Sequence, residues 1–341
     1  MAEREVIGPE PGVSVVVCCY NSAEVIAPTI DALAGQVVPV GAGYEVILVD
    51  NNCTDDTVRQ AENSWKNPLY PLRIVAEPEP GLIHARKTGV MSAQYEILLF
   101  VDDDNILEPG WAGALLSLYP RMPGTAAIGG YNEPLCEGEK PAWFDEFASM
   151  YACTPQWENP GQSAAKPTLF GAGLSFRTSV IRSIFASPVP LYLVGMKKDV
   201  PSRGEDSEIC LRAGLMGWKL WYEKTLKLKH FILKRRLNWD YVLQCRRGGG
   251  NADIILKIYH DLANKKIPLP YRQLSIYISA LWEEFWQNRV KYKDLIKLKK
   301  IGDGVALRYH YLQGLTEGFL SWEEKDYSET RKNICEFFKG I

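Results

Sequence analysis

The sequence lacks the cysteine and histidine patterns of a disulfide framework or a structural zinc site. Its eight cysteines are scattered, with no CxxC pair, and its four histidines form no tract. Disulfide-rich domains and zinc sites draw their bridges or ligands from closely spaced residues of these types. We therefore predict a cytoplasmic protein with reduced cysteines.

Long apolar runs and a strong net charge are also missing. No apolar stretch approaches the roughly 20 residues that span a bilayer, and the first twelve residues, MAEREVIGPEPG, lack the pattern of a signal peptide. The net charge of the 341-residue chain is -2, so its overall field favours neither nucleic acid nor an acidic partner. We expect a globular protein without a membrane span that does not bind nucleic acid.

Most of the chain alternates between short apolar runs and helical patterns. β-branched runs such as VSVVVCCYN (13–21) and YEILLFVD (95–102) predict buried strands, and segments of helical length separate them. This alternation is typical of an α/β fold with a mostly parallel sheet flanked by helices. Because long helical patterns rich in Trp and Tyr take over near residue 235, we predict an α/β domain over 1–235 and a helical C-terminal region over 236–341.

Polar clusters follow three of the predicted strands. The clusters are Tyr20-Asn21, Asp50-Asn51-Asn52 and Asp102-Asp103-Asp104. Open α/β sheets bind ligands at the edge where the carboxyl ends of parallel strands meet. Any one cluster is explained equally well by helix capping or a turn, but three together predict a ligand site.

The segment EILLFVDDDN (96–105) ends an apolar run in three adjacent carboxylates. Like charges this close repel, and burial of an unpaired one costs several kcal/mol, so we expect a cation there. Along an extended chain alternate side chains share a face, which would let Asp102 and Asp104 converge while Asp103 points elsewhere. Such oxygen ligands suit Mg²⁺ or Mn²⁺. The alternative is a solvated acidic turn.

Six motifs together resemble a known enzyme family. VSVVVCCYNS, VILVDNNCTDDT, GLIHARKTGV, LLFVDDDN, GAGLSFR and GEDSEICLRAG occur in the order and approximate spacing of family 2 glycosyltransferases. The resemblance covers about the first two thirds of the chain. It implies a GT-A fold and a metal-dependent, inverting transfer of a sugar from a nucleoside-diphosphate sugar to an acceptor hydroxyl.

Two other functions are weighed beside this one. A sugar nucleotidyltransferase of similar fold would need a Gly-rich phosphate loop with a basic residue after the first strand, and CCYNSAEV has neither. A scaffold of the same fold that binds nucleotide or sugar without catalysis need not keep Asp104 and Asp206. We therefore expect a glycosyltransferase of the hexosyltransferase type.

The resemblance also implies which residues contact the donor. Asp50 would bind the nucleotide base, Arg86 the diphosphate or base, and Asp102 the ribose or the water shell of the metal. The full set of expected donor contacts is Tyr20, Asn21, Asp50, Asn52, Arg86, Asp102, Asp103 and Glu205. The two asparagines after Asp50 depart from the common Asp-Asp or Asp-Gly pattern, which leaves the base open, with UDP favoured over GDP or dTDP.

The remaining expected roles concern the metal and the acceptor. Asp104 would ligate Mn²⁺ or Mg²⁺, with His230 as a second ligand, although a lone histidine is more often a packed residue. Asp206 would deprotonate the acceptor hydroxyl; the alternative is a capping role at a helix start. The acceptor-side loop would be Gly171, Ala172 and Gly173, unless these residues form an ordinary tight turn.

The expected partners are a nucleotide-sugar donor and a glycan or lipid-linked acceptor. Basic residues between 224 and 247, and Trp- and Lys-rich C-terminal helices, would suit the inner face of a membrane, a diphosphate or a solvated surface. In QCRRG (244–248), Gly248 stands where processive members of the family have Trp, which disfavours a processive polymer synthase. No pattern indicates an oligomeric state.

Overall fold

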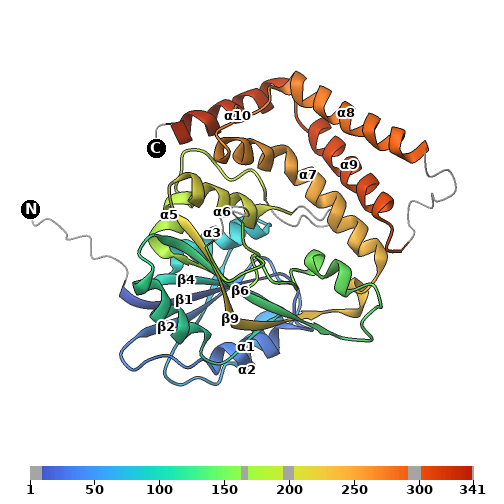
Figure 1. Ribbon diagram of the computed structural model, residues 1–341. Coiled ribbons are helices and arrows are strands. Elements are labelled where there is room, and N and C mark those ends of the chain that lie inside the picture. The colour runs from blue at the N-terminus through green and yellow to red at the C-terminus, as the bar shows by residue number, and fades with distance from the viewer. Residues whose placement is uncertain (1–9, 163–167, 195–202, 291–300, 340–341) are drawn as a thin grey trace, which may run out of the picture. The chain divides into compact units, whose positions relative to one another are not determined.

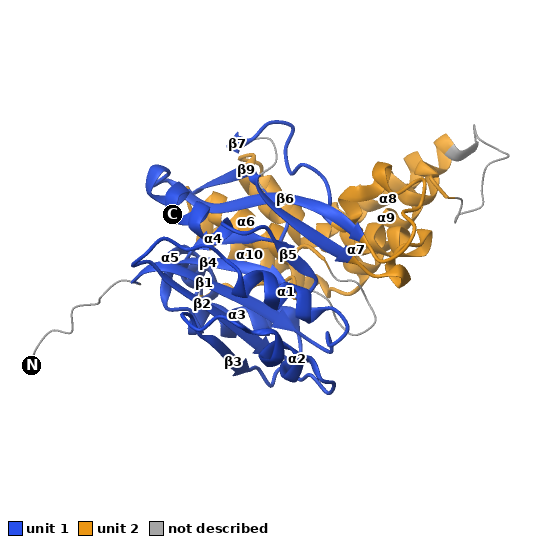
Figure 2. Ribbon diagram, turned by 90° about the horizontal axis from the view of Figure 1, so that it is seen from below, with its two compact units in different colours: residues 1–135, 152–187, 218–231 blue, residues 136–151, 188–217, 232–341 orange. Residues whose placement is uncertain are grey.

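The computed structural model describes residues 10–162, 168–194, 203–290 and 301–339 (Figure 1). The chain divides into two compact units, coloured separately in Figure 2. Unit 1 comprises Met1–Leu135, Ala152–Ser187 and Trp218–Phe231, and unit 2 comprises Cys136–Tyr151, Pro188–Gly217 and Ile232–Ile341. These units are defined by packing, so the functional boundary expected between residues 235 and 236 stays a prediction.

Unit 1 is built on one mixed sheet with flanking helices. Its strands are β1 (Glu10–Cys19), β2 (Gly43–Asp50), β3 (Leu72–Ala76), β4 (Tyr95–Asp102), β5 (Asn105–Leu107), β6 (Thr125–Cys136), β7 (Gly161–Gln162), β8 (Leu174–Arg177) and β9 (Lys219–Ile232). Its helices are α1 (Ile26–Ala34), α2 (Thr57–Ser64), α3 (Leu82–Ser92), α4 (Trp111–Leu118) and α5 (Thr178–Phe185), with a short 3₁₀ turn at Tyr119–Arg121.

The sheet has a parallel half and an antiparallel half. Its strands lie in the order β3-β2-β1-β4-β8-β6-β9-β5, and β7 pairs with β9. Strands β3, β2, β1 and β4 are parallel, whereas β8 is antiparallel to β4 and β6, and β5 and β7 are antiparallel to β9. The expected α/β class with flanking helices is confirmed, and the antiparallel half is an addition that the sequence pattern did not indicate.

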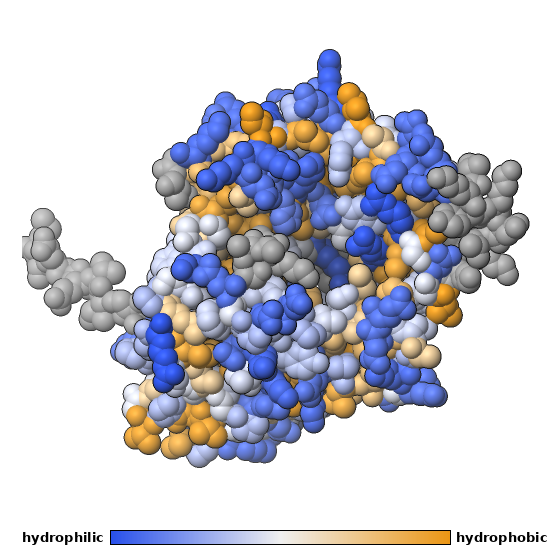
Figure 3. Space-filling model, in the orientation of Figure 1, coloured by the Kyte–Doolittle hydropathy of each residue, from blue (hydrophilic) through white to orange (hydrophobic). Residues whose placement is uncertain are grey.

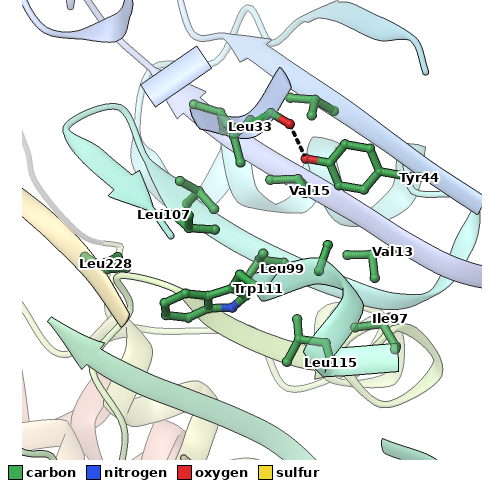
Figure 4. Packing of buried hydrophobic residues seen from close by; sticks show 14 of the residues in the cluster. Val13, Val15, Leu33, Tyr44, Ile97, Leu99, Leu107, Trp111, Leu115 and Leu228 are labelled. Carbon is green, nitrogen blue, oxygen red and sulfur yellow. Dashed lines mark hydrogen bonds between the residues drawn. The ribbon is translucent and has the colours of Figure 1, made fainter. Parts of the chain in front are cut away.

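One face of the sheet packs against α1, α2 and α4. β-branched residues fit the pleated surface of a strand, and Val13, Val15 and Val17 of β1, which point to this face, are fully buried. Trp111 of α4 lies among Leu99 of β4 and Leu228 of β9 (Figure 4). The buried hydroxyl of Tyr44 donates to the carbonyl of Leu33, 2.9 Å away, so this polar group in the core has a hydrogen-bond partner.

Helices α3 and α5 cover the other face. α3 packs against β1 and β2, and α5 packs against β4 and β8. The guanidinium group of Arg182 on α5 donates to the carbonyls of Val90 and Ala93 at the end of α3. This contact anchors the helix that carries Arg86.

Unit 2 contains the helical C-terminal region, as expected. Its helices are α6 (Glu205–Leu215), α7 (Trp239–Ala263), α8 (Tyr271–Val290), α9 (Gly304–Leu320) and α10 (Glu324–Lys339), with 3₁₀ segments at Asp145–Tyr151 and Lys234–Arg236. Helices α7 and α9 cross closely because glycines line their contact. A Cβ on Gly250 would lie 2.1 Å from the carbonyl oxygen of Tyr311, and one on Gly314 would lie 1.8 Å from that of Arg247.

The described helices include none with the length and apolar character of a membrane span. On the face drawn in Figure 3, hydrophilic and hydrophobic residues are interspersed. Exposed apolar side chains on α8 include Ile276 and Trp286.

Candidate functional site

The structure brings polar residues that follow the parallel strands to one edge of the sheet. Cys19 at the end of β1 lies opposite Asp50 at the end of β2, which in turn lies opposite Ala76 at the end of β3. On the other side of β1, Cys18 lies opposite Asp102 of β4. The predicted meeting of the three polar clusters at one edge is therefore confirmed, at the place where open α/β sheets bind ligands.

The loops that follow β1 and β2 are tied together. The side-chain oxygen of Asn21, a residue in the left-handed region (φ 52°), accepts hydrogen bonds from the backbone N–H of Thr54 at 2.7 Å and from its hydroxyl at 3.3 Å. One carboxylate oxygen of Asp50 accepts from the backbone N–H of Cys53 at 2.8 Å. The ring of Tyr20 beside them is 48% exposed, so a flat ligand can stack on it.

The two asparagines after Asp50 hold the loop that follows β3. The side-chain amide of Asn51 donates to the carbonyls of Glu77 at 2.9 Å and Glu79 at 2.7 Å, and its oxygen accepts from the N–H of Gly81 at 2.8 Å. Asn52, also left-handed (φ 68°), donates to the Glu77 carbonyl at 3.2 Å. A carboxylate could not donate these bonds. The departure from the common family pattern therefore has a structural reason in this chain, and the expected contact of Asn52 with the donor stays a prediction.

The acidic segment turns at the end of β4 instead of continuing as a strand. Asp102 is the last residue of the strand, the next two residues form a turn, and the Asp102 N–H donates to the side-chain oxygen of Asn105 at 3.2 Å. The Asp103 carboxylate accepts from the hydroxyl of Ser22, and its carbonyl accepts from Thr29 at 2.9 Å. The extended geometry expected for all three aspartates is therefore wrong beyond Asp102, because Asn105 closes the turn.

Asp104 and His230 face each other across the β5–β9 pair. Asn105 of β5 lies opposite His230 of β9, and Asp104 Oδ2 lies 3.5 Å from His230 Nε2. Asp104 is only 6% exposed, and its other oxygen accepts from the Asn105 amide at 3.0 Å. Burial by itself lowers the pKa of His230, but the charge and hydrogen bond of Asp104 outweigh it and hold that pKa well above its usual value.

Cys153 is a further member of this cluster that no sequence pattern indicated. Its sulfur lies 3.7 Å from Nδ1 of His230, on the opposite side of the imidazole from the nitrogen that faces Asp104. A partner on one ring nitrogen of a histidine sets the tautomer and orients the ring. Cys153 thus helps to hold the His230 ring with Nε2 toward Asp104.

Arg86 lies beneath the acidic edge. It is 3% exposed on α3, and its guanidinium carbon lies 5.2 Å from the centre of the Phe100 ring of β4. Burial raises the pKa of the Cys18 thiol to about 12, with the Arg86 charge opposing this shift and the charges of Asp102 and Asp103 adding to it. Arg86 therefore places a buried positive charge near the same strand ends that carry the carboxylates.

The Asp104–His230 pair suits a divalent cation. Neighbouring ligands of an octahedral ion bound at about 2.1 Å lie roughly 3 Å apart, close to the 3.5 Å between Asp104 Oδ2 and His230 Nε2. Within the described residues, no group of three or more His, Cys, Asp or Glu side chains is placed to hold a metal. Mg²⁺ and Mn²⁺ commonly take one or two protein ligands and complete their shell with substrate phosphates and water. The residues present fit an ion of this kind.

Comparison with known proteins identifies the family. A family model described as glycosyl transferase family 2 matches residues 14–185, which are 172 of the 341 residues of the chain. The chain belongs to glycosyl transferase family 2. One curated relative, the poly(ribitol-phosphate) beta-glucosyltransferase of Bacillus spizizenii, is 33% identical over 98 residues, which cover 28% of this chain and 15% of that protein. Across several curated relatives that match, the aligned region spans between 15% and 62% of their own length.

Solved structures of similar fold span most of the chain. The mannosyltransferase PcManGT from Pyrobaculum calidifontis, in complex with GDP-Man and Mn²⁺, has a TM-score of 0.56 and 18% identity, and the match covers 93% of this chain and 91% of that one. TarS 1-349 from S. aureus, in complex with UDP, has a TM-score of 0.50 and 14% identity, with coverage of 91% and 90%. At these identities the likeness shows the fold alone.

In this family 2 chain, the expected acceptor-side loop is a tight turn before β8. Gly173 adopts a positive φ of 69°, and a Cβ there would lie 2.7 Å from a methyl carbon of Leu228 and 2.9 Å from the Trp111 ring. Ala172 is buried. Because turn geometry and core packing already account for Gly173, the acceptor role of Gly171, Ala172 and Gly173 stays a prediction.

The expected base of the family 2 reaction lies in unit 2, at the start of α6. Gly204 precedes the helix with a φ of 105°, and Glu205 and Asp206 stand in its first turn. Glu205 is buried, whereas Asp206 is partly exposed. A helix start at this motif is what the sequence predicted, and the roles of Glu205 and Asp206 stay predictions.

A buried ionic network that the sequence pattern did not indicate holds α6. Glu208 Oε2 accepts hydrogen bonds from the backbone N–H groups of Tyr192 at 3.0 Å and Leu193 at 2.8 Å, and Oε1 accepts from that of Tyr192 at 3.1 Å. Glu208 also accepts from Arg212 and from the Tyr259 hydroxyl, each at 2.9 Å. The first turn of α6, with Asp206, is therefore locked to the segment before it and to α7.

Proposed function

We propose that the chain transfers a sugar, with inversion, from a nucleoside-diphosphate sugar to an acceptor hydroxyl and that it requires Mn²⁺ or Mg²⁺. The observation that carries this proposal is the Asp104–His230 pair, 3.5 Å apart, at the sheet edge that also carries Tyr20 and Asp50. A nucleotide bound along that edge would place its base near Tyr20 and its diphosphate near Asp104.

Each of these residues has a distinct role in the proposed reaction. Tyr20 stacks on the base, Asp50 accepts a hydrogen bond from it, and Asp104 with His230 holds the divalent cation. When bound, the cation neutralises charge on the departing nucleoside diphosphate. Asp206 takes the proton of the acceptor hydroxyl, because an alcohol is a poor nucleophile at neutral pH.

The other expected donor contacts belong to the same proposal. We propose that Asn21, Asn52, Arg86, Asp102, Asp103 and Glu205 complete the donor site. Asp103 and Asn21 would act through the loops that they brace, and the buried charge of Arg86 would favour the diphosphate from beneath the strand ends. In this proposal residues 1–235 form the donor-binding and catalytic domain.

UDP is the favoured donor nucleotide, and the favoured acceptor is a glycan, a lipid-linked glycan or another cell-envelope polymer. TarS was solved with UDP and with UDP-GlcNAc, which supports a UDP-sugar, whereas PcManGT was solved with GDP-Man. The Bacillus spizizenii relative is named for a poly(ribitol-phosphate) acceptor, which supports a polymeric acceptor.

A thermal-shift titration tests the donor half of the proposal. UDP, GDP and dTDP are each added with and without Mn²⁺, to the wild type, to Asp104→Asn and to Asp31→Asn, an exposed residue of α1 that serves as the control. A ligand at 100 times its Kd stabilises the fold by about 2.7 kcal/mol. We expect one nucleotide to raise the melting temperature of the wild type only when metal is present. Asp104→Asn should abolish this shift, and Asp31→Asn should keep it. Stabilisation of Asp104→Asn equal to that of the wild type would refute the metal site.

Sugar transfer tests the catalytic half. A positioned base contributes about 10²- to 10⁴-fold, so Asp206→Asn should lose transfer by that factor and keep nucleotide binding. Near wild-type transfer by a folded Asp206→Asn variant would remove the proposed base. Tight nucleotide binding with no turnover of any donor would favour a non-catalytic scaffold.

A further inference from the structure

Two cysteine side chains meet at the edge where the donor is proposed to bind. Cys19 is the last residue of β1, and Cys53 lies just beyond the end of β2, which pairs with β1 in parallel. Their sulfur atoms are 3.9 Å apart, and both thiols are reduced. A disulfide needs about 2.05 Å between sulfurs, so the gap closes with roughly 2 Å of sulfur movement.

The two thiols differ in a way that suits a reactive pair. Cys53 is partly exposed, whereas Cys19 is 2% exposed. The hydrogen bond between the Cys53 and Cys19 sulfurs, aided by the backbone N–H of Asn21 at 3.4 Å, lowers the pKa of Cys53 against the opposing effects of burial and Asp50. The thiolate is the nucleophilic form of cysteine. Cys53 is therefore the thiol that reacts first, with Cys19 in place as the second.

We propose that Cys19 and Cys53 form a reversible disulfide that switches off donor binding. With hydrogen peroxide as oxidant, the Cys53 thiolate attacks one oxygen to give a sulfenic acid and releases hydroxide. The Cys19 sulfur then attacks the sulfenic sulfur, the S–S bond forms and water leaves. In total, two thiols and one peroxide give one disulfide and two waters, and a thiol reductant reverses the change.

The disulfide would alter the donor site through contacts that Cys53 makes now. The Cys53 N–H donates to Asp50, and the Asn21 N–H donates to the Cys53 sulfur. A bond to Cys19 draws Cys53 toward β1 and disturbs both contacts, so Asp50 and Asn21 leave their present positions. The loss of nucleotide affinity rests on the proposed function, whereas formation of the disulfide does not.

Cys18 provides a matched control. It is adjacent to Cys19, but successive side chains of a strand point to opposite faces, and the charges of Arg86 and Asp102 act on its thiol. Cys18 has no described contact with Cys53. Its substitution should therefore leave the switch intact.

Peptide mapping tests the disulfide itself. Protein treated with peroxide, then with a thiol-blocking reagent, is cleaved after glutamate without reduction. Because Pro11 protects the bond after Glu10, this separates residues 6–24, with Cys18 and Cys19, from residues 46–62, with Cys53. We expect a linked pair of these peptides from the wild type and from Cys18→Ser, and none from Cys53→Ser or Cys19→Ser. Absence of the linked pair in wild-type protein, or its persistence in folded Cys19→Ser, would overturn the proposal.

Nucleotide titration before and after peroxide tests the consequence. We expect the Kd of the stabilising nucleotide to rise about tenfold on oxidation, equivalent to the loss of one or two hydrogen bonds, and to recover after dithiothreitol. Because Cys53 is partly exposed, Cys53→Ser should fold normally. This variant should keep its affinity for the nucleotide after peroxide. Equal losses in wild type and Cys53→Ser would overturn the switch. If no nucleotide binds the reduced protein, the proposed function and the switch both fail, while the peptide map still decides whether the disulfide forms.

Discussion

Removal of the Glu208 carboxylate should be among the most destabilising single changes in unit 2. Glu208 and Arg212 are fully buried, and the carboxylate accepts from Arg212, Tyr259 and two backbone N–H groups. Glutamine has one oxygen for these donors, so Glu208→Gln turns an NH₂ group toward some of them and leaves the Arg212 charge without its partner. Breaking a buried ion pair in this way costs about 3–5 kcal/mol. At roughly 2–4 °C per kcal/mol for a body of this size, the melting temperature should fall by about 6–20 °C.

An exposed ion pair of the same kind in unit 2 serves as the control. Arg247 and Glu317 face each other on α7 and α9 with side chains 46% and 45% exposed, and such pairs contribute about 0–1 kcal/mol. Urea denaturation of wild type, Glu208→Gln and Glu317→Gln at constant pH measures both free energies of unfolding. Losses of equal size in the two variants would refute the burial reasoning. If Asp206 is the base, as proposed, a folded Glu208→Gln should also lose sugar transfer, because the network anchors α6, whose first turn carries Asp206.

Three further outcomes follow from the described contacts. Gly250→Ala should destabilise the protein by about 1–3 kcal/mol, because the added Cβ would lie 2.1 Å from a backbone oxygen. Gly249→Ala, with open space around its Cβ, should stabilise it by about 0.5–1 kcal/mol. Urea denaturation that ranks the two variants otherwise would contradict the close α7–α9 crossing. Asn51→Asp should cost about 1–3 kcal/mol and weaken nucleotide binding, since a carboxylate would face two carbonyl groups; an unchanged unfolding curve would contradict this. The pKa of Cys53 is lowered and that of Cys18 is raised to about 12, so iodoacetamide at about pH 8 should label Cys53 before Cys18. Mass spectrometry showing the reverse order in native protein would contradict this difference in pKa.

The parallel half of the sheet could be predicted because its strands carry a strong local signal. β1 and β4 are long β-branched or apolar runs buried on both faces, and such runs read as parallel strands. The antiparallel strands β5 and β8 have three and four residues, too short for a periodic signal. β9 is long, but its lysines obscure the alternation, so the strand that carries His230 could not be recognised from the sequence.

The functional site likewise contains residues that the local sequence predicts and residues that it does not. The aspartates and Tyr20 were found because they follow strands directly, where the fold class alone places a ligand edge. Cys153 was missed because it approaches His230 only through the pairing of distant segments, and Glu208 and Arg212 because their partners in the segment before α6 and on α7 are set by tertiary packing. The structural role of Asn51 likewise depends on a loop that follows another strand. Contacts of this kind depend on the fold rather than on local sequence.

The three adjacent carboxylates at the end of β4 do not need a bound cation for the protein to fold. The Asp103 carboxylate accepts from Ser22, Asp104 faces His230 and accepts from Asn105, and the buried charge of Arg86 lies near the same strand ends. Partners from several elements therefore offset the repulsion that first suggested a metal. Because the His230 ring already balances Asp104, a divalent cation would have to displace a proton from that ring to bind. The cation would then stabilise the bound diphosphate rather than the fold.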